Sequence, residues 1–408
     1  MRATRNTARL TNSCITRRRP VETAYRLGEL DGIRGWAALS VVVFHMTWET
    51  FGAVMPQLRN PVTGFFLDGG LAVSVFFVLS GEALSAGFFA GGGTSAVYRL
   101  ALKRYTRLTI PVIAACTLTL LLYKAGLTYH VAAADLVHRS DWLGSFMHAA
   151  PDLRESLKYM LFGVYTNVPN PHAVIPFLWT MRFELLGSIL VFGMLLALSW
   201  LRGLGLSIAW LVIGLLFAAT IYGNQDHLAC FLAGLGFARL RSFGFFTRMQ
   251  SKQWAQIATW IAIVIVGTLD GFSHWLLIKR GWISLASVLL LFAVFCNRRL
   301  CAAFTTRLSQ SLGRISFPLY LVQFPILISF TSYAICYAGS RGTLRPWEVA
   351  AISTVSVLSC LAAARAFEPI ERLTRWVGDA IALLTVESQS AREPQGRARP
   401  VSGGISLL

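Results

Sequence analysis

Residues 30–45 read LDGIRGWAALSVVVFH and begin an apolar run that extends to about residue 50. The run is long enough to cross a bilayer as a helix. Arg34 and His45 lie eleven residues apart within it, so they share one helix face and stand roughly 16 Å apart along the axis. Ionisable groups are costly inside a membrane helix and by default suggest function. This stretch therefore predicts a membrane helix with a polar stripe that leads into the protein.

The composition extends this prediction to the whole chain. Of its 408 residues, 55% are hydrophobic and only 14% are charged, whereas about 25% are charged in soluble domains. The mean hydropathy is +0.57. We therefore expect an all-α, polytopic transmembrane protein with about ten spans. These are 33–50, 69–90, 108–127, 177–200, 205–222, 227–240, 254–272, 281–296, 315–337 and 347–366, of which 227–240 is short for the ~20 residues usually needed.

The distribution of the basic residues predicts the orientation in the membrane. The formal net charge is +18. With the N-terminus in the cytoplasm, 26 of the 37 Lys and Arg residues fall on the cytoplasmic side of the expected spans and eight on the other side. This is the positive-inside pattern, so both termini are expected in the cytoplasm. Topology and contact with the lipid bilayer then explain the charge, and nucleic-acid binding is not expected.

Three segments follow from this interpretation. We expect a basic cytoplasmic arm at 1–28, a membrane domain at 29–377 and a disordered cytoplasmic tail at 378–408. The longest connection, 128–176, would face the extracytoplasmic side. A connection of this length usually has a function or is disordered, and a lid or an acceptor platform is the functional interpretation. Its four histidines lack the HxH and HExxH spacings, so no metal site is expected there.

His45 is the first candidate for chemistry. An imidazole titrates near neutrality, so it can act as a general base or carry an acyl group. The alternative is a histidine that packs between helices and hydrogen-bonds a neighbour. Arg34 on the same face favours the functional interpretation. Asp31, one turn before Arg34, is a candidate ion-pair partner; alternatively that pair only anchors the helix at the interface.

Three more charged residues stand out in the apolar segments. Arg104 and Arg107 would share a helix face, and paired guanidinium groups suit phosphate, although ordinary positive-inside anchoring is the alternative. Glu184 lies in apolar sequence and must be paired, protonated or hydrated. Because Arg182 is only two residues away and points elsewhere on the helix, we expect the partner of Glu184 on another span, for a structural or a catalytic purpose.

Together these segments resemble the integral-membrane acyltransferase family 3, whose members transfer acyl groups to glycans and small molecules. The resemblance covers about residues 29–371, and it rests on the order and placement of several short motifs. These are LDGIRG followed by His45, FFVLSG at 76–81, RxxR at 104–107, LWT with Glu184 at 178–184, LGRIS with LYL at 312–321, and EP at 368–369.

The resemblance implies an acyl-CoA donor, most often acetyl-CoA, which binds from the cytoplasm as a substrate and not as a permanent cofactor. The acceptor would be a hydroxyl of a glycan or another small-molecule alcohol. His45 would be catalytic, Arg34 would order it or stabilise developing charge, and Arg104 and Arg107 would hold the phosphates of coenzyme A. We include Glu184 among the candidate catalytic residues. Supporting positions within the motifs are Asp31, Ser80, Trp179, Tyr320 and Glu368.

Two positions depart from the family pattern. Gln323 stands where many members carry His. An amide can hydrogen-bond but cannot exchange a proton near pH 7, which places any essential proton transfer on His45. Glu82 stands where the family usually has an apolar residue, and nothing in the sequence explains it.

We therefore expect a multi-pass O-acyltransferase in a bacterial inner membrane. Two other functions are open: a secondary transporter or flippase with an intramembrane Arg/His/Glu path, and a non-catalytic family member that binds a partner. The first alternative predicts inverted repeats, which the sequence does not show. The acceptor, the acyl chain length and the oligomeric state are left open.

Overall fold

The computed structural model describes residues 27–147, 152–166, 173–223, 225–272 and 281–390, and these residues form helices without any strand. The long helices are α1 (Gly28–Val43), α3 (Gly69–Gly87), α4 (Gly93–Lys124), α8 (Thr180–Trp200), α9 (Leu204–Tyr222), α10 (Asp226–Ser242), α12 (Gln253–Gly271), α14 (Trp282–Cys296), α17 (Ser316–Ile326), α19 (Pro346–Ala366) and α20 (Glu368–Ser390). The prediction of an all-α protein is confirmed.

Shorter elements join these helices. The α-helical ones are α2 (Pro61–Phe66), α5 (His130–Leu136), α6 (Leu153–Lys158), α7 (Val164–Thr166), α11 (Phe245–Gln250), α15 (Arg298–Phe304), α16 (Arg307–Arg314) and α18 (Ser332–Gly339). Four π-helical turns are η1 (Phe44–Glu49), η3 (Phe88–Gly92), η5 (Tyr159–Gly163) and η7 (Leu327–Thr331). The 3₁₀ turns are η2 (Pro56–Leu58), η4 (Leu143–Ser145) and η6 (Pro176–Trp179).

The helices carry the apolar character of membrane spans. Within the described residues six continuous helical segments are long and apolar enough to cross a membrane, or seven if the bent pair α14 and α15 counts as one span. Helix α9 is the most apolar of the six, and only 6% of its best window is buried inside the protein. Such an unpartnered apolar surface suits contact with lipid. The number of ten spans and the cytoplasmic position of both termini remain predictions.

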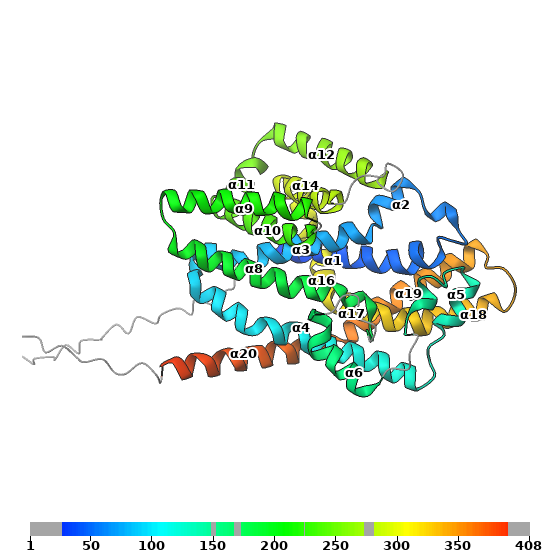
Figure 1. Ribbon diagram of the computed structural model, residues 1–408. Coiled ribbons are helices and arrows are strands. Elements are labelled where there is room, and N and C mark those ends of the chain that lie inside the picture. The colour runs from blue at the N-terminus through cyan, green and yellow to red at the C-terminus, as the bar shows by residue number, and fades with distance from the viewer. Residues whose placement is uncertain (1–26, 148–151, 167–172, 224, 273–280, 391–408) are drawn as a thin grey trace, which may run out of the picture.

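Helix α1 lies between two hydrophobic cores. On one side Ala38 and Val42 belong to a core built with α4, α17, α19 and the 128–176 connection. On the other side Ile33 and Val41 belong to a core built with α3, α8, α10 and α14. Figure 1 shows α1 in the middle of a bundle whose helices run mostly side by side. Any group on α1 is therefore held from several directions.

Glycines bring the neighbouring backbones close to α1 and α3. A Cβ added to Gly35 would lie 2.6 Å from the carbonyl carbon of Leu312 before α17, and one added to Gly32 would collide with Phe304. A Cβ on Gly234 of α10 would lie 2.6 Å from the backbone nitrogen of Glu82 on α3. Small residues at these points let the helices approach each other closely, as in other membrane bundles.

The two ends of the bundle differ. In Figure 1, α5 and α18 lie at one end and α20 extends towards the other. Helix α20 packs along α4, where Lys103 and Asp379 form an ion pair at 2.5 Å. This helix continues to Ser390, past residue 378 where we expected the tail to begin. The outer parts of the expected arm and tail, residues 1–26 and 391–408, lie outside the described residues.

Candidate active site

His45 lies in the π-helical turn η1, which continues α1 without a break. Its carbonyl oxygen accepts a hydrogen bond from the Thr50 hydroxyl at 2.6 Å, a contact that spans the wider turn. Single π turns inside α-helices are rare and often occur at functional sites. The side chain is half-buried, so it is held by the protein without being sealed from its surroundings.

The His45 ring is held by an amide and by aromatic rings. Its Nδ1 lies 3.0 Å from Oε1 of Gln323 on α17. The ring stacks on Phe177 of η6, with centroids 4.1 Å apart and planes 9° apart. Trp142 lies nearly parallel to it at 5.9 Å. The imidazole therefore has a fixed position and orientation.

Tyr320 supports this arrangement from one turn before Gln323. Its hydroxyl donates to the carbonyl oxygen of Phe177 and lies 2.8 Å from the Thr180 hydroxyl. Tyr320 thus holds η6, which carries the ring that stacks on His45. The LYL motif contributes to the site through this contact.

Arg34 belongs to a second polar group, on the side of α1 that faces α3, α4 and α8. Its Nη2 donates to the Ser80 hydroxyl at 3.4 Å, and Ser80 donates to Oε1 of Glu184 at 2.8 Å. The other oxygen of Glu184 forms an ion pair with Nη2 of Arg104. The prediction that Glu184 finds its partner on another helix is therefore confirmed, and Ser80 joins two charged groups in addition to packing.

Three arginines come together in this group, and each of them interacts with a carboxylate. Nε of Arg104 donates to the Ser188 hydroxyl at 2.7 Å, which fixes the guanidinium in addition to its bond to Glu184. Arg107 is exposed and interacts electrostatically with Arg34, with Arg104 and with Glu371 of α20. Three guanidinium groups thus lie close together, and guanidinium groups suit the binding of a phosphorylated ligand.

The remaining predicted residues lie near these two groups in different ways. Asp31 acts electrostatically on Arg34, more weakly than Glu184 does. Trp179, 36% exposed, contacts the rings of Phe183 and His227, with centroids 5.9 Å and 5.4 Å away. Glu368 lies in the first turn of α20, where the positive end of the helix favours a carboxylate.

The 128–176 connection reaches the site. Arg139, 9% exposed, forms an ion pair at 2.9 Å with Glu49, which lies in η1 together with His45. Its guanidinium also lies 5.2 Å from the ring centre of Trp142. The connection therefore covers His45 with Trp142 and is attached beside it by an ion pair. Of its histidines, His148 and His172 lie outside the described residues.

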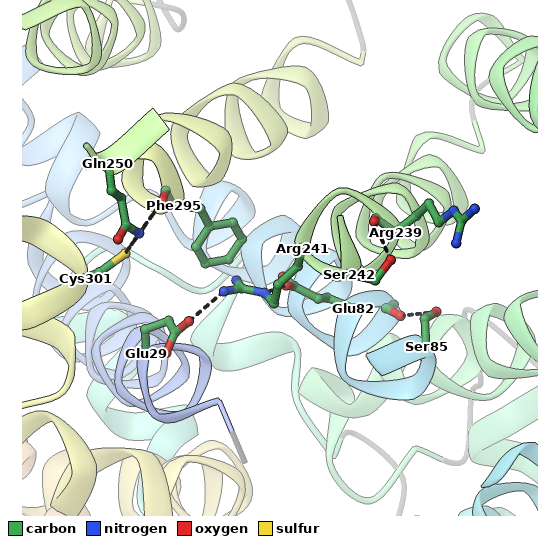
Figure 2. Close-up of polar contacts among 10 residues, drawn as sticks. Glu29, Glu82, Ser85, Arg239, Arg241, Ser242, Gln250, Phe295 and Cys301 are labelled. Carbon is green, nitrogen blue, oxygen red and sulfur yellow. Dashed lines mark hydrogen bonds and ion pairs between the residues drawn. The ribbon is translucent and has the colours of Figure 1, made fainter. Parts of the chain in front are cut away.

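Glu82 has a structural explanation. Figure 2 shows Arg241 of α10 between two carboxylates, Glu29 of α1 and Glu82 of α3. Nε of Arg241 donates to Glu82 at 2.7 Å and Nη1 donates to Glu29 at 2.7 Å. The guanidinium also lies 4.8 Å from the ring centre of Phe295. Glu82 thus takes part in an ion-pair triad that joins α1, α3 and α10.

Several contributing residues were missed at the sequence level. Ser188 could have been found, because it lies four residues after Glu184 and hence on the same helix face. Phe177 and Trp142 had no signal of their own, since single aromatic residues are frequent in this chain.

Within the described residues no group of three or more His, Cys, Asp or Glu side chains comes together in a way that could hold a metal ion.

Comparison with known proteins identifies the family. A family model for an acyltransferase domain, that of acyltransferase family 3, matches residues 27–365, which include both polar groups. No curated protein and no solved structure matches the chain. A match over this much of the chain, together with the apolar helices, means that the chain belongs to acyltransferase family 3 and is a membrane O-acyltransferase.

Proposed function

We propose that this enzyme transfers an acyl group, most often acetyl, from acyl-CoA to a hydroxyl of a glycan or another alcohol. The acyl-CoA is a donor substrate that enters from the cytoplasm. Arg34, Arg104 and Arg107 bind its phosphates, with Glu184 holding the first two in place. His45 carries out the chemistry at the far end of the donor.

The observation that carries this proposal is the arrangement of the two polar groups along one helix. Arg34 and His45 stand roughly 16 Å apart along α1 and η1, at the rise per residue of a helix. The pantetheine arm between the thioester and the diphosphate of coenzyme A also spans roughly 16 Å when extended, at the rise per bond of an extended chain. A donor bound by its phosphates at the arginines therefore brings its thioester to His45.

Two chemical routes are open to His45, direct transfer and transfer through an acyl-histidine. Both require an unprotonated ring nitrogen on His45. In direct transfer, this nitrogen takes the proton of the acceptor hydroxyl while the oxygen attacks the thioester carbon. The C–S bond then breaks, and the coenzyme A thiolate takes the proton from the imidazolium. In the covalent route the ring nitrogen itself attacks the thioester carbon, the C–S bond breaks and coenzyme A leaves as the thiolate. The acceptor oxygen then attacks the acyl-imidazole carbon, the C–N bond breaks, and the hydroxyl proton passes to the thiolate.

The acceptor side follows from the 128–176 connection. Trp142 lies beside His45 and is partly exposed, and a flat apolar ring of this kind suits the C–H face of a sugar. With both termini in the cytoplasm, as the positive-inside pattern predicts, this ring lies in the outer half of the membrane. An acceptor at the outer surface of a bacterial inner membrane would reach His45 from this side.

The test is acyl transfer by the purified protein. We expect His45→Ala to abolish release of coenzyme A from acetyl-CoA in the presence of a panel of sugar and alcohol acceptors, with expression unchanged. His138→Ala, a change of an exposed histidine in the 128–176 connection, should leave the rate unchanged. Full activity of His45→Ala would refute the assignment. Substrate uptake into proteoliposomes without acyl-CoA would instead support a transporter, a function that the family match does not favour.

A further inference from the structure

The orientation of the Gln323 amide follows from its two neighbours. Its Nε2 lies 3.0 Å from the carbonyl oxygen of Tyr320, and its Oε1 lies 3.0 Å from Nδ1 of His45. A backbone carbonyl oxygen only accepts hydrogen bonds, so the amide NH₂ has to face Tyr320. The amide oxygen is thereby directed at His45. Gln323 is fully buried, and water does not compete for either contact.

This orientation determines where His45 carries its proton. The amide oxygen only accepts hydrogen bonds, so Nδ1 of His45 has to be the donor. In a neutral imidazole one nitrogen carries the hydrogen and the other keeps its lone pair. The lone pair is therefore on Nε2. The side-chain hydrogen bonds of the described residues include none to Nε2, and the ring also interacts with the backbone of Val41, one turn earlier, whose carbonyl oxygen only accepts.

We infer that Gln323 is a positioning residue that holds His45 in the Nδ1–H tautomer, so that Nε2 is the atom that accepts the proton or the acyl group. The inference rests on the proposed role of His45 in acyl transfer. It gives a function to Gln323, which stands where many family members carry a titratable His. The Gln323 amide stays neutral, so it accepts the hydrogen bond from Nδ1 in the same direction at every pH. The proton taken up during transfer therefore stays on His45 until the leaving thiolate collects it.

The packing around His45 fixes the plane of the ring in which Gln323 acts. Tyr320 donates its hydroxyl to the carbonyl of Phe177, and the Phe177 ring stacks on the imidazole. Stacking fixes the plane of the imidazole, and the bond to Gln323 fixes its rotation within that plane. Both contacts start from α17, three residues apart. One helical turn thus sets the position and the tautomer of the reacting group.

Gln323→Met tests the role in turnover, because methionine has a similar length but offers no amide to either neighbour. We expect kcat to fall about 10- to 100-fold, as when the partner that orients a working histidine is removed elsewhere. The KM for acetyl-CoA should stay unchanged, since the arginines are untouched. Gln323→Glu keeps an oxygen acceptor for Nδ1, but its titratable carboxyl can compete for the proton of His45 and it loses the NH₂ that faces Tyr320, so only part of kcat should return. Gln256→Met is the matched control, because its amide also bonds backbone groups, on α12 away from the site.

Nitrogen NMR of protein labelled with ¹⁵N-histidine tests the tautomer without relying on activity. The His45 signals are assigned by their loss in His45→Ala. We expect a protonated Nδ1 and an unprotonated Nε2 in the wild type, and loss of the fixed Nδ1–H signal in Gln323→Met. A protonated Nε2 in the neutral wild type would overturn the inference, as would an unchanged kcat in Gln323→Met. Absence of acyl transfer by a wild type that shows the expected tautomer would refute the proposed function instead.

Discussion

The contact between α1 and the LGRIS segment makes Gly35 a sensitive position, next to Arg34. A Cβ at Gly35 would lie closer than 3.0 Å to three atoms, two of which belong to the backbone of Leu312 and Gly313. Backbone atoms cannot rotate away as a side chain does. Gly28, on the same helix, offers the comparison, because a Cβ there would lie 3.6 Å from the side chains of Gln310 and Thr305, an ordinary contact.

We expect Gly35→Ala to destabilise the protein by about 2 kcal/mol. Overpacking costs about 3 kcal/mol at the upper end of its usual range, and a gain in helix propensity of up to about 1 kcal/mol offsets part of this. In a chain of this length a loss of that size lowers the melting temperature by about 2 to 3 °C. The helix also has to move by roughly 1 Å to remove the clash, and a misplacement of that size can cost about 100-fold in rate. The 3.4 Å bond from Arg34 to Ser80 has little tolerance for such a shift.

Thermal unfolding in detergent and coenzyme A release are the two measurements. Gly35→Ala should have a lower melting temperature and a lower rate of coenzyme A release than the wild type. Gly28→Ala should match the wild type in both quantities. The reasoning would be refuted if Gly35→Ala were as stable and as active as Gly28→Ala, because the close approach of α1 to Leu312 and Gly313 would then not exist.

Three further outcomes follow from the site and its surroundings. Arg104→Lys should raise the KM for acetyl-CoA about 10-fold, because an ammonium cannot bond Ser188 and Glu184 at the same time as a forked guanidinium does. Arg99→Lys, at an exposed position of α4, should leave this KM unchanged, and steady-state kinetics of both variants test the prediction. Arg241→Leu leaves Glu82 buried without its cation and should cost about 3 to 5 kcal/mol of unfolding free energy. Lys158→Ala, which removes an exposed ion pair to Glu155, should cost less than about 1 kcal/mol, and equal melting temperatures for these two variants would contradict the triad. Trp142→Ala opens the covered side of His45 and should raise acetyl-CoA hydrolysis without acceptor, and the exposed Trp200→Ala serves as its control.

Features that depend on residues close together in the chain could be predicted from the sequence. The contacts between distant segments could not. Glu184 needed a partner on another helix because Arg182 points elsewhere, and that requirement was visible from helical geometry alone. That the partner is Arg104 depends on which helices lie side by side. The partner of Glu82, Arg241, is 159 positions away in the chain, and no local pattern connects the two. Trp142 is a similar case, because its contact with His45 depends on how a long connection folds back.

The spacing within two motifs explains why the chemistry depends on α16 and α17 as much as on α1. Gly35 and His45 are ten residues apart, and so are Gly313 and Gln323. Gly313 packs against the backbone of α1 near Gly35, and Gln323 bonds His45. Equal spacing with contact at both ends requires the two segments to run alongside each other in the same direction. A single-residue slip of either segment would turn its far side chain by about 100°. The close glycine contact therefore sets the register that brings Gln323 to His45, so the residues that fix the tautomer and those that fix the helix act as one unit.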